Sequence, residues 1–281
     1  MELRRRTYAL PYPVFEIPDY DAKYYTIMRM AIAQDISFVI TPNPSTVIRL
    51  LNIADQRRES LIRDVRDGAI APDLAIEPGL RARLDAQLRP DPRRAEELES
   101  IVTDAGFLDP AGYWPHLGLL GCWKGGSVGV TLERLRDWLR PDMPYRDIGF
   151  LASEAQMTVP ISDDDSGGVL AVDTNVYEFV PEDEMESSEP PVLTVGQLEL
   201  GGCYYVLLTT PSGLYRYDIN DVIQVTGFLH KTPIIAFVRK GRDMVSLTGE
   251  KLHVGQVMAA IADAKQKTGV EVEHFRIVGN A

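Results

Sequence analysis

Long apolar runs are missing from this sequence of 281 residues. The longest runs, residues 204–208 and 233–238, have the length of a strand, whereas a membrane span needs about 20 apolar residues. The basic start at residues 4–6 is not followed by an apolar stretch of the signal-peptide type. We therefore expect a protein without a membrane segment.

Cysteine and histidine are also scarce, and basic residues are outnumbered by acidic ones. The two cysteines, Cys122 and Cys203, lie in apolar, strand-like settings, which indicates reduced core residues and a cytoplasmic protein. The four histidines are scattered without the spacing of metal ligands. The net charge of −12 opposes nucleic-acid binding, which depends on basic surface to neutralise phosphates.

The first half of the chain has the apolar spacing of helices. This spacing predicts helices over residues 24–33 and from Asn43 to about Asp67, where Asn43 is the N-cap, Pro44 fits the first turn and Gly68 ends the helix. A short buried strand is expected at residues 38–40, and two further helices at residues 80–88 and 94–105.

A complete βαβ unit follows. Residues 117–123 are apolar on both faces, as in a parallel strand covered on both sides. A glycine turn at residues 124–127 leads to a helix at residues 132–139 and then to a second predicted strand at residues 148–152. This unit predicts a parallel sheet with flanking helices.

From residue 161 onward the chain has a β character. Strands are predicted at residues 169–180, 203–210, 214–217, 222–226 and 233–238, each bounded by glycine, proline or charged residues, as in an antiparallel sheet. A helix at residues 254–267 and a strand at residues 271–278 then begin a new layer. The expected fold class is α/β: a partial parallel sheet, then an antiparallel region over residues 1–240, and the start of a small α+β cap over residues 241–281.

Polar side chains follow directly on the second strand of the βαβ unit. Phe150 lies within that strand, and Ser153 and Glu154 come at its end. Because ligands of open α/β sheets bind at the carboxyl ends of strands, these side chains are candidates to stack a base, touch a phosphate and hold a metal. The alternative is that Phe150 is a core residue and that Ser153 and Glu154 are an ordinary polar strand exit.

Three stretches resemble those of adenylate-forming enzymes and occur in the same order. They are residues 123–127, 149–154 and 213–222. Taken together they resemble the Gretchen Hagen three family of acyl-acid amido synthetases, which has auxin-responsive plant members and bacterial members. The resemblance continues through residues 43–45, 225–228 and 232–233, so it covers most of the chain.

The resemblance implies a role for particular residues. Phe150 occupies the position of an aromatic next to adenine, Ser153 that of a hydroxyl near the phosphates, and Glu154 that of a carboxylate associated with Mg²⁺. Mg²⁺ prefers one or two carboxylates together with nucleotide phosphates and water. Asp221 matches the aspartate that accepts the ribose hydroxyls, although an aspartate there also suits a turn cap.

Two further parts of the pattern concern the backbone and the hinge. Gly125 and Gly126 would let the backbone approach the nucleotide closely. Residues 241–243 resemble the superfamily hinge, where Arg242 would reach the nucleotide; the alternative is that Arg242 is a solvated charge. The chain departs from the plant motif at Asp218 and Asn220, where plant members have arginine and glycine.

The implied activity is ATP-dependent adenylation of a small carboxylic acid, followed by conjugation to an amino acid, with ATP and Mg²⁺ as cofactors. Acyl- or aryl-CoA ligation on the same scaffold is one alternative. A non-catalytic relative that binds a nucleotide or a partner is another. The Ser/Thr/Gly-rich phosphate loop expected early in the family is missing. We therefore expect a central fragment that is inactive alone and that exposes sheet surface for self-association or for a complementing chain.

Overall fold

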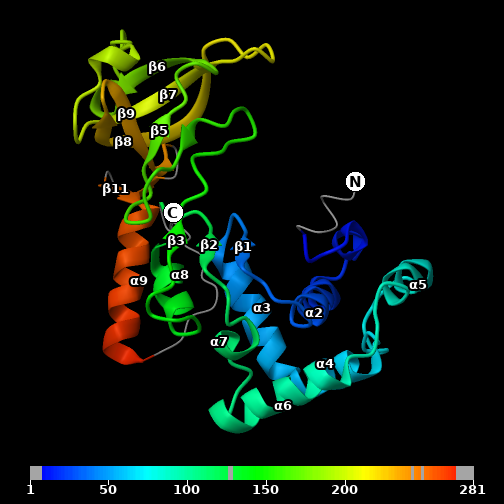
Figure 1. The fold of residues 1–281 in the computed structure, drawn as a ribbon. Coiled ribbons are helices and arrows are strands. Elements are labelled where there is room, and N and C mark those ends of the chain that lie inside the picture. The colour runs from blue at the N-terminus through cyan, green and yellow to red at the C-terminus, as the bar shows by residue number, and fades with distance from the viewer. Residues whose placement is uncertain (1–7, 126–128, 242–243, 248–249, 270–281) are drawn as a thin grey trace. The chain divides into compact units, whose positions relative to one another are not determined.

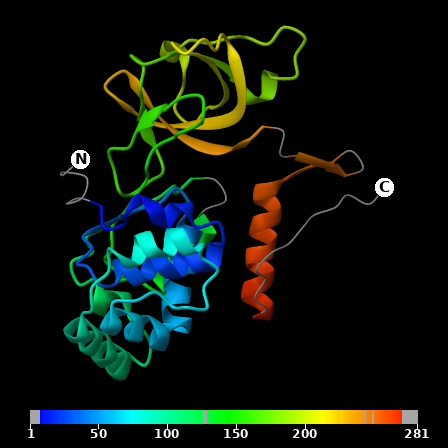
Figure 2. The same cartoon turned by 90° about the vertical axis from the view of Figure 1, so that its right-hand side faces the viewer.

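The computed structural model describes residues 8–125, 129–241, 244–247 and 250–269 (Figure 1). The chain divides into two compact units. The first contains Met1–Gly121 and Thr131–Pro144, and the second contains Cys122–Val130 and Tyr145–Ala281. The first unit is mainly helical, and the second contains an antiparallel sheet (Figure 2).

The first part of the chain contains the predicted helices near their expected positions and two short helices, at residues 12–16 and 110–113, that were not predicted. Together they are the 3₁₀ helix η1 (Tyr12–Glu16) and helices α2 (Tyr20–Ala31), α3 (Pro44–Gln56), α4 (Arg58–Asp67), α5 (Pro78–Asp85), α6 (Pro92–Ala105), α7 (Pro110–Tyr113) and α8 (Gly129–Arg136). The single helix predicted from Asn43 to Asp67 is two helices, because Arg57 leaves the helical conformation at φ −109° and ψ 23°. The predicted caps are present: the Asn43 side chain accepts from the Ser45 amide at 3.0 Å, and Gly68 ends α4 at φ 69°.

A parallel strand pair confirms part of the predicted sheet. Strand β1 (Phe38–Ile40) pairs in parallel with β2 (Leu119–Gly121). The predicted position of β1 is right, but its predicted burial is wrong, because Phe38 and Ile40 are exposed. The strand predicted at residues 148–152 is wrong: the second unit has instead a short strand β3 (Tyr145–Arg146). The chain turns directly after β3, because the Asp147 carboxylate accepts the Gly149 amide at 2.7 Å and Gly149 has a φ of 92°, a conformation that favours glycine.

Six antiparallel strands form the body of the second unit. They are β4 (Thr158–Val159), β5 (Gly168–Leu170), β6 (Val176–Pro181), β7 (Cys203–Thr209), β8 (Tyr217–Leu229) and β9 (Thr232–Lys240), in the order β4-β5-β9-β8-β7-β6. The strand predicted at residues 169–180 is therefore two strands. The strand predicted at residues 222–226 is the middle of β8, a longer strand with register shifts at Val222/Ile223 and Val225/Gly227.

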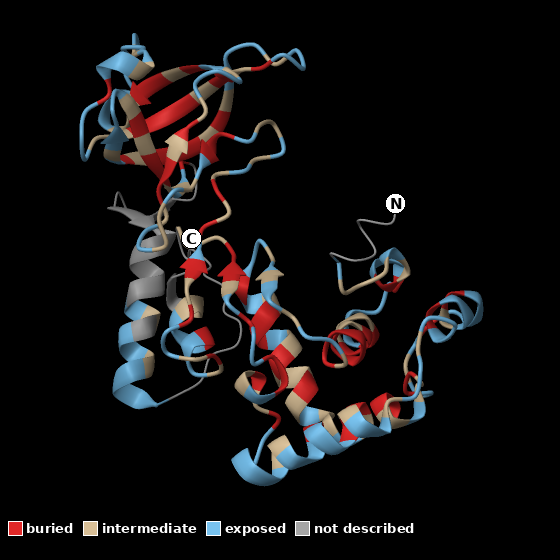
Figure 3. Cartoon of the chain, viewed as in Figure 1, coloured by how far each residue is buried: buried red, intermediate tan, exposed pale blue. Residues whose placement is uncertain are grey.

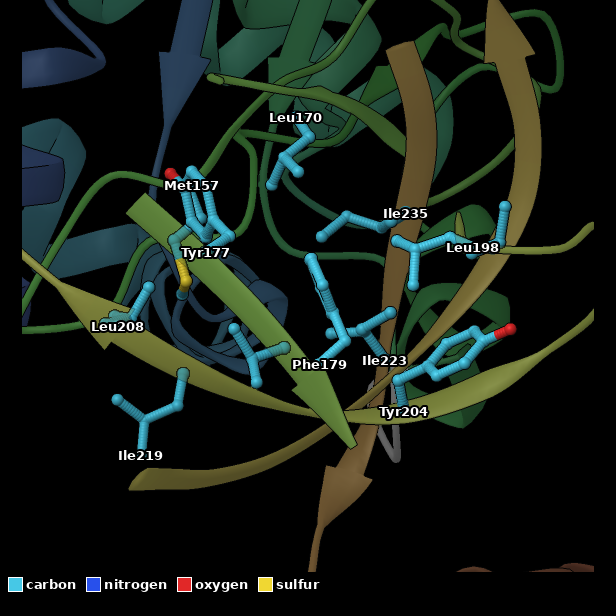
Figure 4. Packing of buried hydrophobic residues seen from close by; sticks show 12 residues of the cluster. Met157, Leu170, Tyr177, Phe179, Leu198, Tyr204, Leu208, Ile219, Ile223 and Ile235 are labelled. Carbon is cyan, nitrogen blue, oxygen red and sulfur yellow. The ribbon is translucent and has the colours of Figure 1, made fainter. Parts of the chain in front are cut away.

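The inward-facing side chains of this sheet form its core. Phe179, Ile223 and Ile235 are buried here with Met157 and other apolar residues, and Figure 4 shows them converging from different strands. Several consecutive residues are buried in the middle of β7 and β8, and Figure 3 shows buried residues along the strands of this sheet and exposed residues in many of its connections. The predicted antiparallel region is thus confirmed, together with the α/β class.

The last described segment forms a separate small sheet and a helix. Strand β10 (Met244–Leu247) pairs antiparallel with β11 (Glu250–His253). Helix α9 (Val254–Thr268) follows, and its bounds agree with those of the predicted helix at residues 254–267 to within one residue. The strand predicted at residues 271–278 lies outside the described residues. The domain boundary at residue 241 stays a prediction. Within the part of the chain that the structure describes, no helix is long and apolar enough to cross a membrane.

Candidate functional site

A pocket of about 480 Å³ opens in the second unit. Its volume lies within the range of about 300–1,000 Å³ that is usual for small-molecule sites. Five of the seven residues predicted from the sequence line it, namely Gly125, Phe150, Ser153, Glu154 and Asp221. The other two, Gly126 and Arg242, lie outside the described residues. The fold therefore brings most of the candidate site residues together, although they lie far apart in the sequence.

A buried carboxylate, Asp147, joins the two loops that form one wall of the pocket. Its Oδ2 accepts the Lys124 amide and its Oδ1 accepts the Gly149 amide, both at 2.7 Å. Burial raises the pKa of the Asp147 carboxyl, and the two backbone hydrogen bonds act in the opposite direction. The sequence analysis missed Asp147, although an aspartate two residues before a glycine is a signal for such a turn.

Ser153 and Glu154, predicted to follow the end of a strand, lie instead in a small hairpin over residues 150–157. Leu151 forms an antiparallel bridge with Gln156, and the Ala152 amide donates to the Ala155 carbonyl at 3.0 Å. Ser153 and Glu154 stand at the tip, where Ser153 is exposed and Glu154 is half-buried. Their position on the pocket follows from this turn and not from the end of a parallel strand, so the physical reason given for the prediction was wrong.

Aromatic side chains supply the apolar surface of the pocket. Phe150 is half-buried and lies with its ring centroid 5.6 Å from that of Phe237. The Trp123 indole N–H donates to the Gly149 carbonyl at 3.1 Å. Phe150 also packs against the core of the six-stranded sheet, so it is a core contact and a pocket residue at once. The planar ring of a ligand could stack against the aromatic side chains that line this pocket.

Asp221 is a second buried acid of the pocket, in addition to Asp147. It lies in β8 opposite Lys240 of β9, and the Lys240 ammonium forms an ion pair with Asp221 Oδ1. Burial raises the pKa of the Asp221 carboxyl; Lys240 lowers it, and the charge of Glu154 raises it further. The turn cap considered for Asp221 is made by Asp218, whose Oδ1 accepts the Asn220 amide at 2.7 Å.

The sequence analysis also missed Lys240, Ser166 and Phe237, which line the same pocket. Phe237 and Lys240 come from β9 and reach the pocket because of the pairing of β9 with β5 and β8. Their role depends on the register of two strand pairs, one of which contains bulges. No local pattern in the sequence signals that register.

Comparison with known proteins assigns the family. Residues 1–143 match the GH3 family N-terminal domain, and residues 168–240 match the GH3 family central domain. The chain belongs to the GH3 family. It is 22% identical over 282 residues to the 4-substituted benzoates-glutamate ligase GH3.12 of Arabidopsis thaliana, covering 96% of this chain and 48% of that protein. It is 23% identical to the probable indole-3-acetic acid-amido synthetase GH3.11 of Oryza sativa subsp. japonica, covering 79% of this chain and 40% of that protein.

A solved GH3 structure has the same fold. The GH3.15 acyl acid amido synthetase superposes with a TM-score of 0.77 at 19% identity, over 92% of this chain and 47% of that one. The predicted family and fold are thereby confirmed. The chain spans less than half the length of the GH3 relatives described here.

Proposed function

We propose that this chain forms the nucleotide-binding part of an ATP-dependent enzyme that adenylates a small carboxylic acid and joins it to an amino acid. The observation that carries the proposal is that Phe150, Glu154 and Asp221 line one pocket. Relatives support the reaction class, because they include the 4-substituted benzoates-glutamate ligase and a jasmonoyl–L-amino acid synthetase of Nicotiana attenuata.

The chemistry explains why such an enzyme needs ATP. A carboxylate is a poor electrophile, so its oxygen attacks the α-phosphorus of ATP and pyrophosphate leaves. The amine of the amino acid then attacks the acyl carbon, an amide forms and AMP leaves. The chain's part is to bind and orient the nucleotide: Phe150 beside adenine, Asp221 accepting the ribose hydroxyls and Ser153 near the phosphates. The backbone at Gly125 and Gly126 would approach it, and Arg242 would reach it from the next segment.

Glu154 fits the role of a magnesium ligand in part. It is a half-buried carboxylate on the pocket, and no side chain of the described residues forms an ion pair with it. Nowhere in the described ranges do three histidine, cysteine or acidic side chains lie together as a metal cluster. A cation at Glu154 would therefore take its remaining ligands from phosphates and water, as Mg²⁺ commonly does, and would offset charge on the phosphates.

Catalysis should need more than this chain. The Ser/Thr/Gly-rich phosphate loop expected from the resemblance is not in the sequence, so we expect no turnover from the chain alone. The exposed side chains of Phe38 and Ile40 on β1 offer a surface for self-association or for a complementing polypeptide. Cys122 and Cys203 are free thiols, which suits the reducing cytoplasm.

Two measurements test the proposal. Calorimetric titration of this chain should show binding of adenosine and AMP, and absence of binding would overturn the nucleotide assignment. Pyrophosphate release should appear when the chain is combined with a polypeptide that supplies a phosphate loop, together with ATP, Mg²⁺ and a panel of acids. Amino acids and CoA are then offered as competing acceptors, and a thioester product would favour a CoA ligase instead.

A further inference from the structure

We propose that Lys240 is a positioning residue for the nucleoside: its ammonium group holds the Asp221 carboxylate in the orientation that accepts the ribose hydroxyls. The inference rests on the proposed function, because it names the residue that prepares Asp221 for that ligand. Neither the pattern of the family resemblance nor the spacing of the sequence pointed to Lys240.

The geometry places the ammonium group between β8 and β9. Lys240 and Asp221 are direct partners in the register of these strands, and the Lys240 ammonium contacts Asp221 Oδ1. It also donates to the Ile219 carbonyl at 3.3 Å. Two contacts to the same strand fix the end of a long side chain that would otherwise be free to rotate.

Because Asp221 is buried, its carboxylate depends on the ion pair with Lys240 to compensate its charge. The Asp221 side chain is 3% exposed, and the Lys240 side chain is 48% exposed at the pocket. Among the described residues, Asp221 Oδ1 has no regular hydrogen-bond partner, so the ion pair with Lys240 is the contact that compensates its charge, and the nearby Glu154 and Asp218 add negative charge. A buried carboxylate that lost its cation would turn toward other donors or take up a proton.

One ammonium group does not saturate a carboxylate. An ionised carboxylate has about four lone-pair positions on two oxygens, so a carboxylate held at Oδ1 still has acceptor capacity for hydroxyl donors. Charge-assisted hydrogen bonds of this kind are about twice as strong as neutral ones. Lys240 therefore restricts the rotation of Asp221 without occupying the whole acceptor.

The residues on both sides of Lys240 are anchored, Arg239 through its side chain and Gly241 through its backbone. Arg239 forms an ion pair with Glu182. The Gly241 amide donates to the Asn220 carbonyl at 2.8 Å. Asn220 is the residue before Asp221, so the backbones of the two partners are tied together next to the ion pair. This preorganisation distinguishes Lys240 from a lysine on an open surface.

The test compares two nucleosides that differ only in the groups that Asp221 would bind. Adenosine and 2′,3′-dideoxyadenosine are titrated calorimetrically into the wild type and into Lys240→Met, Lys240→Arg and Lys231→Met. Lys231 is exposed in the turn between β8 and β9 and does not line the pocket, so its variant carries the same change of charge and shape. The readout is the ratio of the two dissociation constants for each protein.

We expect the wild type, Lys240→Arg and Lys231→Met to prefer adenosine by about ten- to a hundredfold, the range of charged hydrogen bonds. Lys240→Met should lose most of this preference and still bind dideoxyadenosine as the wild type does. A structural role alone would weaken both nucleosides together and keep the ratio, which would overturn the inference. Tighter adenosine binding by Lys240→Met would also overturn it, since Lys240 would then compete with the ribose. Failure of the wild type to bind either nucleoside would instead overturn the proposed function.

Discussion

At the residue scale, two of the pocket carboxylates, Glu154 and Asp221, should have separable effects on ligand binding. Glu154→Gln keeps the shape and removes one charge, so it should weaken the binding of ATP with Mg²⁺ about tenfold and leave adenosine binding unchanged. Asp221→Asn should weaken adenosine binding by about 1.5–3 kcal/mol through the loss of charge-assisted hydrogen bonds. Calorimetric titrations with and without Mg²⁺ measure both.

The control for these variants is Glu189→Gln, because Glu189 is exposed in an acidic connection and does not line the pocket. It should leave all titrations unchanged. Equal losses of Mg²⁺-ATP and adenosine in both pocket variants would contradict separate roles for Glu154 and Asp221.

The buried thiol of Cys122 gives a prediction about pH. Burial raises the pKa of Cys122 to about 11 from the ordinary 9.0, so the folded protein keeps this proton where the unfolded chain loses it. Unfolding then releases a proton, and stability should fall as the pH rises from about 9 to about 11. Urea denaturation across this range should show a smaller fall for Cys122→Ala.

The half-buried Cys203 serves as an internal comparison for Cys122. With iodoacetamide at pH 8, the native protein should be alkylated first at Cys203, and Cys122 should react only after unfolding. Mass spectrometry of the labelled peptides identifies the order. Rapid labelling of Cys122 in the native protein would show that its thiol is not buried.

At the scale of elements, the packing at the end of β9 requires a glycine at position 241. A side-chain carbon added at Gly241 would lie 2.1 Å from Tyr205 Cε1, closer than such atoms ever approach. Because the Tyr205 ring is itself buried, Gly241→Ala should force it out of place and cost about 1–3 kcal/mol of unfolding free energy. Urea denaturation at neutral pH measures this loss.

The matched substitution is Gly196→Ala, because an added carbon at Gly196 meets nothing within 4 Å. It should change stability by less than about 0.5 kcal/mol. An equal loss in both variants would mean that the glycines act through backbone freedom and that the Tyr205 contact is unimportant.

At the scale of the whole molecule, the apolar edge strand β1 predicts self-association. Phe38 and Ile40 are 47% and 60% exposed, and β1 lies at the edge of its sheet. Exposed apolar edges tend to pair with other chains. Analytical ultracentrifugation should show the wild type as an associating species, and the double variant Phe38→Ser/Ile40→Thr should shift it toward the monomer. Leu200→Ser, which removes an even more exposed apolar side chain elsewhere, should not change the association.

Local signals predicted the elements better than they predicted the site. Asn43 and Gly68 marked helix ends because their capping bonds involve residues that are neighbours in the sequence. The turn after β3 was missed because the Asp147 carboxylate competes with strand pairing for the backbone amide of Gly149. Glu154 and Asp221 were selected through the family resemblance, and only the three-dimensional fold could show that Lys240, at the end of β9, lines the same pocket.

Because the pocket is assembled from separate segments of the chain, it limits where the protein can be truncated without loss of binding. The two segments that match GH3 domains end at residue 143 and begin again at residue 168, so Asp147 and the hairpin at residues 150–157 belong to neither. A truncated chain of residues 168–240 would keep Asp221 and Lys240 but lose strand β4 and the opposite wall of the pocket. This truncated chain should show no nucleotide binding in a ligand screen. That negative result would not be evidence against nucleotide binding by the intact chain.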